Sequence, residues 1–251
     1  MLKLMLIAGL AAVAQLTTCN KKEKSKPCDA SLQNGLIAWY PLNGDAKDYS
    51  GNNKHGQLMN GTGFSSDNRG RADSAAQFDG SDDYILIKDA SNYFAPPKLS
   101  VSFLVNLRDV SARSSLFCKS AFNAPTGLTW GCFITNKLVF RVTEPNVNCD
   151  ALWYDNSDYD LYSTNQFKNN RWYAVTLIFN EGVELMYIDG KLNTARVNTF
   201  SGLKQCSSAD LRIGGWWKND IISIHGKLDN IRFYNRILSE TEIEALAREV
   251  Q

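Results

Sequence analysis

The chain has 251 residues, of which 44% are hydrophobic and 21% are charged, and its formal net charge is +1. This composition is typical of a globular protein with a sizeable core, and the length fits one large β domain while leaving little room for a second. Because there is no excess of basic residues to attract a phosphate backbone, we expect no nucleic-acid partner.

The N-terminal segment has the features of a bacterial export signal. Lys3 supplies one positive charge, and the apolar run of residues 4–16 is shorter than the roughly 20 residues that cross a hydrocarbon core. The tetrapeptide Leu16-Thr17-Thr18-Cys19 resembles the bacterial lipobox, although Thr18 replaces the usual Gly or Ala. This predicts a signal peptide over residues 1–18 and a lipidated Cys19. The alternative is an ordinary signal peptide with a chance cysteine.

The export signal also predicts where the protein resides. A lipidated Cys19 anchors an exported chain to a membrane of the bacterial cell envelope, with the outer membrane as the favoured one. Residues 19–34 are lysine-rich and polar, which is typical of a flexible tether. Whether the domain faces the periplasm or the cell surface stays open.

The remainder, from residue 35 to residue 251, has the pattern of an all-β domain. Short β-branched or alternating segments lie between clusters of Gly, Asn, Asp and Ser. They predict strands over residues 36–40, 84–88, 99–107, 138–143, 172–180, 183–188, 191–197 and 231–234. Asp189-Gly190 predicts a tight hairpin turn, and Ser239 with Glu242 forms a capping-box pattern that predicts one short C-terminal helix. With no βαβ alternation, these elements favour a two-sheet antiparallel sandwich.

The cysteines after Cys19 predict disulfides, because an exported protein meets an oxidising compartment. They are Cys28, Cys118, Cys132, Cys149 and Cys206. Cys118 and Cys132 lie on what we interpret as consecutive strands, so a bridge between them is one candidate pairing, and Cys149 with Cys206 is the next. No Cys-x-x-Cys motif occurs and only two histidines are present, so zinc and dithiol redox sites are not expected.

Several segments resemble a known family. Residues 35–56, from Gly35-Leu36-Ile37-Ala38-Trp39-Tyr40 onward, and residues 75–85 are similar to the opening of laminin-G-like jelly-roll domains of the concanavalin A-like lectin/glucanase superfamily. Residues 211–215 and 226–239 are similar to its closing strands and helix cap. The resemblance implies a jelly-roll sandwich over residues 35–251 whose first and last strands lie side by side.

The resemblance further implies one structural calcium ion at the corner where these strands meet. Calcium takes six to eight oxygen ligands, which Asp48, Asn53 and Asp229 would supply together with backbone oxygens near Ser50 and His55. The alternative is that Asp48 closes an Asx-type turn and that Asp229 hydrogen-bonds its own strand end.

Catalysis is not expected. Glycoside hydrolases of related sandwich folds need two facing carboxylates, and the Glu-x-Asp-x-x-Glu pattern of the laminarinase-like glucanases is absent. Glu181 and Glu184 have the wrong spacing for one face of a strand. The acidic cluster Asp79, Asp82 and Asp83 lacks the spacing of an EF-hand and is interpreted as turn chemistry.

Aromatic residues in two polar loops predict ligand binding. One loop carries Trp153, Tyr154, Tyr159 and Tyr162, and the other carries Trp216 and Trp217. Aromatic faces stack on sugar rings while nearby carboxylates and amides bond the hydroxyl groups. The alternative is that one tryptophan of each pair fills the core. Trp39, Trp130 and Trp172 lie in apolar segments and are assigned to the core.

These observations favour a non-catalytic carbohydrate-binding or adhesion lipoprotein of the bacterial cell envelope. Its expected partners are a glycan or a cell-surface protein, and a membrane through the N-terminal lipid. The alternatives are a protein-interaction or structural module and a cryptic glycoside hydrolase, because one fold hosts many unrelated sites.

Overall fold

A computed structural model describes residues 30–89, 91–121, 127–147, 149, 160–206, 209–216 and 222–250. The signal peptide, the lipidation site Cys19 and Cys28 lie outside the described residues. Within the described ranges, no helix has the length and apolar character needed to cross a bilayer.

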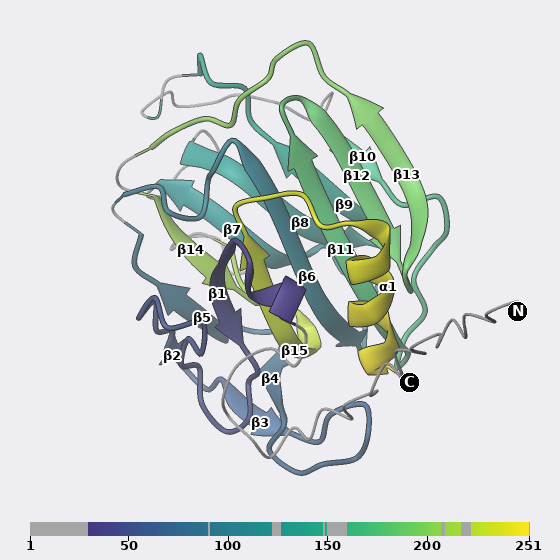
Figure 1. Cartoon of the computed structure of the whole chain (residues 1–251). Coiled ribbons are helices and arrows are strands. Elements are labelled where there is room, and N and C mark those ends of the chain that lie inside the picture. Colours follow the sequence, from purple (N-terminus) through teal and green to yellow (C-terminus); the bar gives the residue numbers. More distant parts are fainter. Residues whose placement is uncertain are drawn as a thin grey trace, which may run out of the picture.

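Two antiparallel sheets stack face to face as a jelly-roll sandwich, as the sequence predicts (Figure 1). Sheet A has the order β13-β12-β11-β6-β15-β4-β3, with β1 also paired to β15, and sheet B has the order β10-β9-β8-β7-β14-β5-β2. Sheet A contains β1 (Leu36–Tyr40), β3 (Gly63–Ser65), β4 (Ala75–Asp79), β6 (Lys98–Leu107), β11 (Trp172–Asn180), β12 (Val183–Ile188), β13 (Lys191–Val197) and β15 (His225–Tyr234). Sheet B contains β2 (Gln57–Met59), β5 (Tyr84–Ile87), β7 (Ser114–Ala121), β8 (Leu128–Thr135), β9 (Lys137–Val142), β10 (Asp160–Tyr162) and β14 (Ala209–Ile213).

The first and last strands lie side by side, which confirms the topology that the resemblance implies. β1 pairs antiparallel with β15, with Trp39 opposite Arg232 and Tyr40 opposite Ile231. β15 begins at His225 rather than at Ile231, because its polar first half continues the sheet by pairing with β4 and β6. This places the N-terminal part of the domain against its C-terminal part.

The main core lies between the sheets and is rich in aromatic rings. Trp130 is completely buried there, and its ring centroid lies 6.2 Å from that of Phe233. Trp39 is also buried but faces away from this core, because its neighbours Ala38 and Tyr40 point inward and adjacent strand residues alternate. Trp172 begins β11 and is only partly buried, so its assignment to the core is wrong.

The C-terminal helix α1 (Glu240–Ala247) confirms the capping-box prediction. The Ser239 hydroxyl accepts from the Glu242 backbone, and the Glu242 carboxylate accepts from the Ser239 backbone. Ile243 and Leu246 are buried in a second apolar cluster with Ile178 of β11, so α1 covers the outer face of sheet A (Figure 1). Short 3-10 helices, Ala30–Gln33 and Arg248–Val250, flank the domain.

The cysteines follow one of the two candidate pairings. Cys149 and Cys206 form a disulfide with 5.9 Å between their Cα atoms, which confirms that prediction. Cys118 and Cys132 are free and buried, so a bridge between them is wrong. Cys118 pairs with Gly131 and Cys132 with Phe117 across β7 and β8, so the offset of one residue turns the two thiols to opposite faces of sheet B.

Candidate functional site

The aromatic loops are only partly within the described residues. Trp153, Tyr154, Tyr159 and Trp217 lie outside them. Trp216 is 4% exposed and packs edge-on against Phe133, with ring centroids 4.3 Å apart. Trp216 therefore offers no exposed face to a sugar, and its prediction as a loop contact is wrong. The alternative, that one tryptophan of the pair is buried, holds for this residue.

Tyr162 is exposed, but it belongs to a strand rather than to a loop. It ends β10, its side chain is 47% exposed, and its hydroxyl donates to Asp160 Oδ2 at 3.2 Å. Arg141 of β9 binds the same carboxylate through Nε and Nη2 at 2.5 and 2.6 Å. Burial and the Asp160 charge raise the pKa of Tyr162 above its usual value. Tyr162 is therefore held in a fixed position at the edge of sheet B.

Asp48 organises its own loop through backbone hydrogen bonds. Its Oδ1 accepts from Trp39 N at 3.0 Å and from Ser50 N at 2.8 Å, and its Oδ2 accepts from Lys54 N at 3.0 Å. The bond from Ser50 is the Asx turn that the alternative expects. Because three amides already occupy this carboxylate, it has little free capacity for a cation.

The other two predicted calcium ligands lie in different environments, one on the surface and one in the interior. Asn53 lies on the surface with a φ of 57°, and Asp229 is completely buried in β15. The calcium site at Asp48, Asn53 and Asp229 stays a prediction.

Asp79, Asp82 and Asp83 lie in the turn between β4 and β5. One ligand atom from each lies within 4.8 Å of the others. Ser81 N donates to Asp79 Oδ1, and Asp83 accepts from the backbone of Asp79 and of Gly61. These bonds are the turn chemistry that the sequence indicates, and burial raises the pKa of Asp83.

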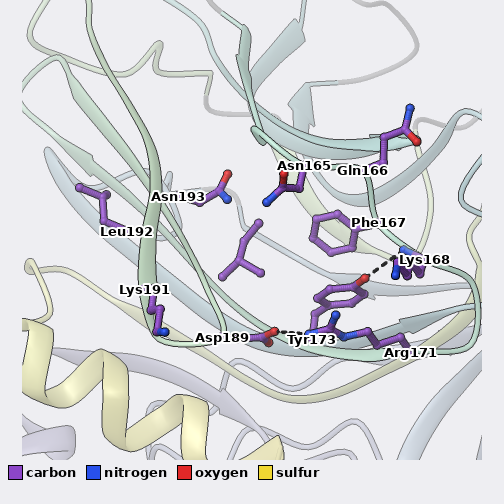
Figure 2. Close-up of a pocket in the computed structure, with 11 residues that line it drawn as sticks. Asn165, Gln166, Phe167, Lys168, Arg171, Tyr173, Asp189, Lys191, Leu192 and Asn193 are labelled. Carbon is purple, nitrogen blue, oxygen red and sulfur yellow. Dashed lines mark hydrogen bonds and ion pairs between the residues drawn. The ribbon is translucent and has the colours of Figure 1, made fainter.

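A pocket of about 790 Å³ opens at the end of sheet A, between the segment that leads into β11 and the β12–β13 hairpin (Figure 2). Its volume falls in the usual range for small-ligand sites, about 300 to 1,000 Å³. It is lined by Asn165, Gln166, Phe167, Lys168, Arg171, Tyr173, Ile188, Asp189, Lys191, Leu192 and Asn193.

The hairpin turn Asp189-Gly190 fixes one side of the pocket. Its two residues have φ values of 51° and 80°, as a tight primed turn between two strands requires. Asp189 N donates to Ala174 O at 2.7 Å, and Asp189 Oδ1 accepts from Ala174 N at 3.0 Å. These two bonds attach the turn to β11, so this wall is rigid.

Aromatic rings form the floor of the pocket. Phe167 and Tyr173 are buried with ring centroids 4.3 Å apart, and the Tyr173 hydroxyl accepts from Lys168 N at 3.0 Å. The Arg171 guanidinium lies over the Tyr173 ring at 4.5 Å and donates to Asp189 Oδ2 at 2.8 Å (Figure 2). The floor and the turn are therefore linked through Arg171.

The third wall is closed by a reciprocal pair of hydrogen bonds. Thr164 N donates to Asn193 Oδ1, and Asn193 Nδ2 donates to Thr164 Oγ1, each at 2.9 Å. This pair joins β13 of sheet A to the segment that follows β10 of sheet B, so the segment that lines the pocket is attached to the β12–β13 hairpin.

The sequence offered a partial signal for this pocket. Asp189-Gly190 predicts the hairpin turn, and the polar run from Asn165 to Arg171 precedes a predicted strand. What the pattern did not indicate is that these two segments, separated along the chain, meet at one end of the sandwich.

Comparison with known proteins agrees with this fold. The family model Laminin_G_3, described as the concanavalin A-like lectin/glucanases superfamily, matches residues 79–244, which is more than half of the chain. No curated protein sequence matches the chain.

Solved structures that the chain is similar to include a domain of an arabinanase and the binding domains of two toxins. Domain 4 of AbnA, a GH43 extracellular arabinanase from Geobacillus stearothermophilus, in complex with arabinotriose, is 19% identical with a TM-score of 0.61, and the match covers 84% of this chain and 98% of that one. The binding domain of Paraclostridial Mosquitocidal Protein 1 is 17% identical with a TM-score of 0.65, covering 87% and 53%.

The binding domain of botulinum neurotoxin DC, in complex with rat synaptotagmin II, is 16% identical with a TM-score of 0.63, covering 88% of this chain and 52% of that one. The chain thus spans about half the length of the toxin domains. At these identities the likeness shows the fold alone. Together, the match to the family model and the two-sheet jelly roll show that the chain belongs to the concanavalin A-like lectin/glucanases superfamily.

Proposed function

We propose that this protein is a non-catalytic carbohydrate-binding domain and that the pocket between the β11 lead-in segment and the β12–β13 hairpin is its binding site. The observation that carries the proposal is a pocket of about 790 Å³ whose rim presents exposed polar side chains over a base closed by Phe167 and Tyr173. Sugar hydroxyl groups need such hydrogen-bond partners, whereas the two rings are 5% and 6% exposed and close the base of the pocket rather than stack on a sugar. The arabinotriose complex of the AbnA domain supports a saccharide as the ligand class.

The carboxylates near the pocket support binding rather than hydrolysis. Asp189 is the one carboxylate among the lining residues, and both of its oxygens are already bonded, to Ala174 N and to Arg171. Glu184 of β12 has a pKa raised to about 8 by burial, which suits a general acid, but it is completely buried and cannot reach a substrate. Two facing accessible carboxylates are needed for glycoside hydrolysis.

Export and lipid anchoring are part of the proposal. They rest on the sequence of residues 1–19, and an oxidising compartment is consistent with the Cys149–Cys206 disulfide. A lipid on Cys19 would place the domain at the surface of a membrane, with residues 20–34 as the tether. Mass spectrometry of the membrane fraction, comparing the chain with its Cys19→Ala variant, tests this part.

A protein partner is the second candidate. Leu192 and Val197 of the edge strand β13 are 54% and 78% exposed, and the toxin binding domain in complex with synaptotagmin, about half of which this chain matches, supports a protein ligand. Exposed apolar side chains on an edge strand favour such contacts.

The decisive experiment is a glycan array followed by calorimetry on the full chain. The variant Asn165→Ala with Gln166→Ala removes two free amides from the pocket rim, and Gln57→Ala with Gln77→Ala removes two exposed amides from β2 and β4 as a matched control. We expect a saturable saccharide signal that the pocket variant loses and the control keeps. Absence of any saccharide binding by folded protein would refute the proposal, and a pull-down lost in Val197→Asp would support the protein partner instead.

A further inference from the structure

The pocket contains more free hydrogen-bond donors than free acceptors. In the part of the chain that the structure describes, the side chains of Asn165, Gln166, Lys168 and Lys191 make no hydrogen bond or ion pair. Each ammonium group carries three donors and no acceptor, and each amide carries two donors and one carbonyl oxygen. A ligand that satisfies this set must be rich in acceptors.

The acceptors on Asp189 and Asn193 are already used, which leaves the carbonyl oxygens of Asn165 and Gln166 as the free side-chain acceptors among the lining residues. Asp189 Oδ2 accepts from Arg171, and its Oδ1 accepts from Ala174 N. Asn193 Oδ1 accepts from Thr164 N. These bonds hold the walls together, so they are not available to a ligand without loosening the pocket.

The charged side chains that have no partner among the lining residues of the pocket are both positive. Arg171 and Asp189 neutralise each other at 2.8 Å, which leaves the positive charges of Lys168 and Lys191 without a carboxylate among the lining residues. Lys168 follows Phe167 on one wall and Lys191 follows the hairpin turn on another, so the two charges come from different walls (Figure 2). A neutral sugar accepts hydrogen bonds from these ammonium groups but gains no attraction between opposite charges, which an anionic ligand gains in addition.

We infer that the ligand of this pocket is an anionic oligosaccharide whose carboxylate or sulfate groups are bound by Lys168 at one end of the pocket and by Lys191 at the other (Figure 2). This inference rests on the proposed function, since it names the class of sugar that the same site takes. The Asn165 and Gln166 amides then bond the ring hydroxyls, and the Arg171–Asp189 pair keeps the hairpin turn in place.

The test compares saccharides that differ in charge but little in shape. The purified full chain is titrated by calorimetry with oligogalacturonate, with its methyl ester, with a sulfated galactan oligosaccharide and with the corresponding neutral galactan. We expect at least one anionic probe to bind about tenfold more tightly than its neutral counterpart, which is what two partly exposed ion pairs provide. Preference for the galacturonate identifies a carboxylate, and preference for the sulfated galactan identifies a sulfate.

The lysine variants make the assignment specific to the pocket. Lys168→Gln with Lys191→Gln should abolish the preference for the charged probe, and raised salt should weaken it in the wild-type chain. Lys47→Gln removes one exposed lysine charge elsewhere and should change nothing. Thermal melts check that all variants are folded.

Different results would refute the anionic ligand and carbohydrate binding itself. Equal binding of charged and neutral probes, or a preference that survives in the double lysine variant, overturns the anionic ligand while leaving carbohydrate binding intact. If no saccharide of either kind binds, both proposals fall.

Discussion

Lys119 of β7 and Asp89 form an ion pair in which both side chains are completely buried, with 2.9 Å between Nζ and Oδ2. Lys119 Nζ also donates to Ala209 O of β14, and Asp89 accepts from the backbone amides of Tyr93 and Phe94. The pair therefore joins sheet B to the segment that leads from β5 to β6. Burial of two charges is tolerated here because each has hydrogen-bond partners besides the other.

Removing one member of this pair should destabilise the fold strongly. Lys119→Met leaves the Asp89 carboxylate buried without its cation, and we expect the free energy of unfolding to fall by about 3–5 kcal/mol in urea titrations. Lys88→Met is the matched control, because Lys88 binds Asp210 at 2.8 Å with a side chain that is 71% exposed. Surface pairs contribute at most about 1 kcal/mol, so similar losses in the two variants would contradict this prediction.

Glu184 should make stability depend on pH. It is completely buried on β12, accepts from Asn198 at 2.6 Å, and faces the charges of Arg196 and Asp160. Burial is the largest cause of its raised pKa, about 8 against an ordinary value of 4.5. Between these two values the folded state keeps the proton that the unfolded chain releases, so the contribution of Glu184 to stability is greatest below about pH 4.5 and is lost as the pH rises towards 8.

The measurement is a series of urea titrations between pH 5 and pH 8. One proton contributes a slope of at most about 1.4 kcal/mol per pH unit, and Glu184→Gln should flatten this part of the profile because the amide does not titrate. A variant whose profile parallels that of the wild-type chain would show that Glu184 is ionised in the folded state.

The cysteines should separate into two chemical classes. Cys118 and Cys132 are buried thiols, and burial raises the pKa of Cys118 to about 12, so both should resist thiol reagents until the protein unfolds. Rapid labelling of either buried thiol in the native chain would contradict the burial of β7 and β8.

The Cys149–Cys206 disulfide spans 57 residues of sequence. Cys149→Ser with Cys206→Ser should lower the free energy of unfolding by about 4 kcal/mol, because the disulfide restricts the unfolded chain.

Asp48 should stabilise its loop mainly through its hydrogen bonds. Asp48→Ala leaves three backbone amides without their acceptor, and we expect a loss of about 2–3 kcal/mol in thermal or urea unfolding, with and without added calcium. The same melts on the wild-type chain with a chelator test the predicted calcium site. A lower unfolding temperature after chelation, restored by calcium and absent in Asp229→Asn, would support metal binding at this corner.

The sequence predicted the bounds of strands and turns correctly where they depend on a local pattern of residues. The strands at residues 36–40, 172–180, 183–188 and 191–197 have the bounds that alternation predicts, and the turn at Asp189-Gly190 follows from its residue types. The sequence indicates a loop where β10 lies, because the three residues of β10 are too few to show a period.

What the sequence by itself determined is the fold class, the helix cap and the family resemblance, because these depend on local periodicity and on motifs at fixed spacing. The pairing of the first and last strands was implied by the resemblance and not by a local pattern. Only the tertiary structure decided that Trp216 is buried, that Cys118 and Cys132 face opposite ways, and that Lys168 and Lys191 line one pocket. Each of these outcomes depends on strand register or on which distant segments meet, and no local pattern along the chain encodes either.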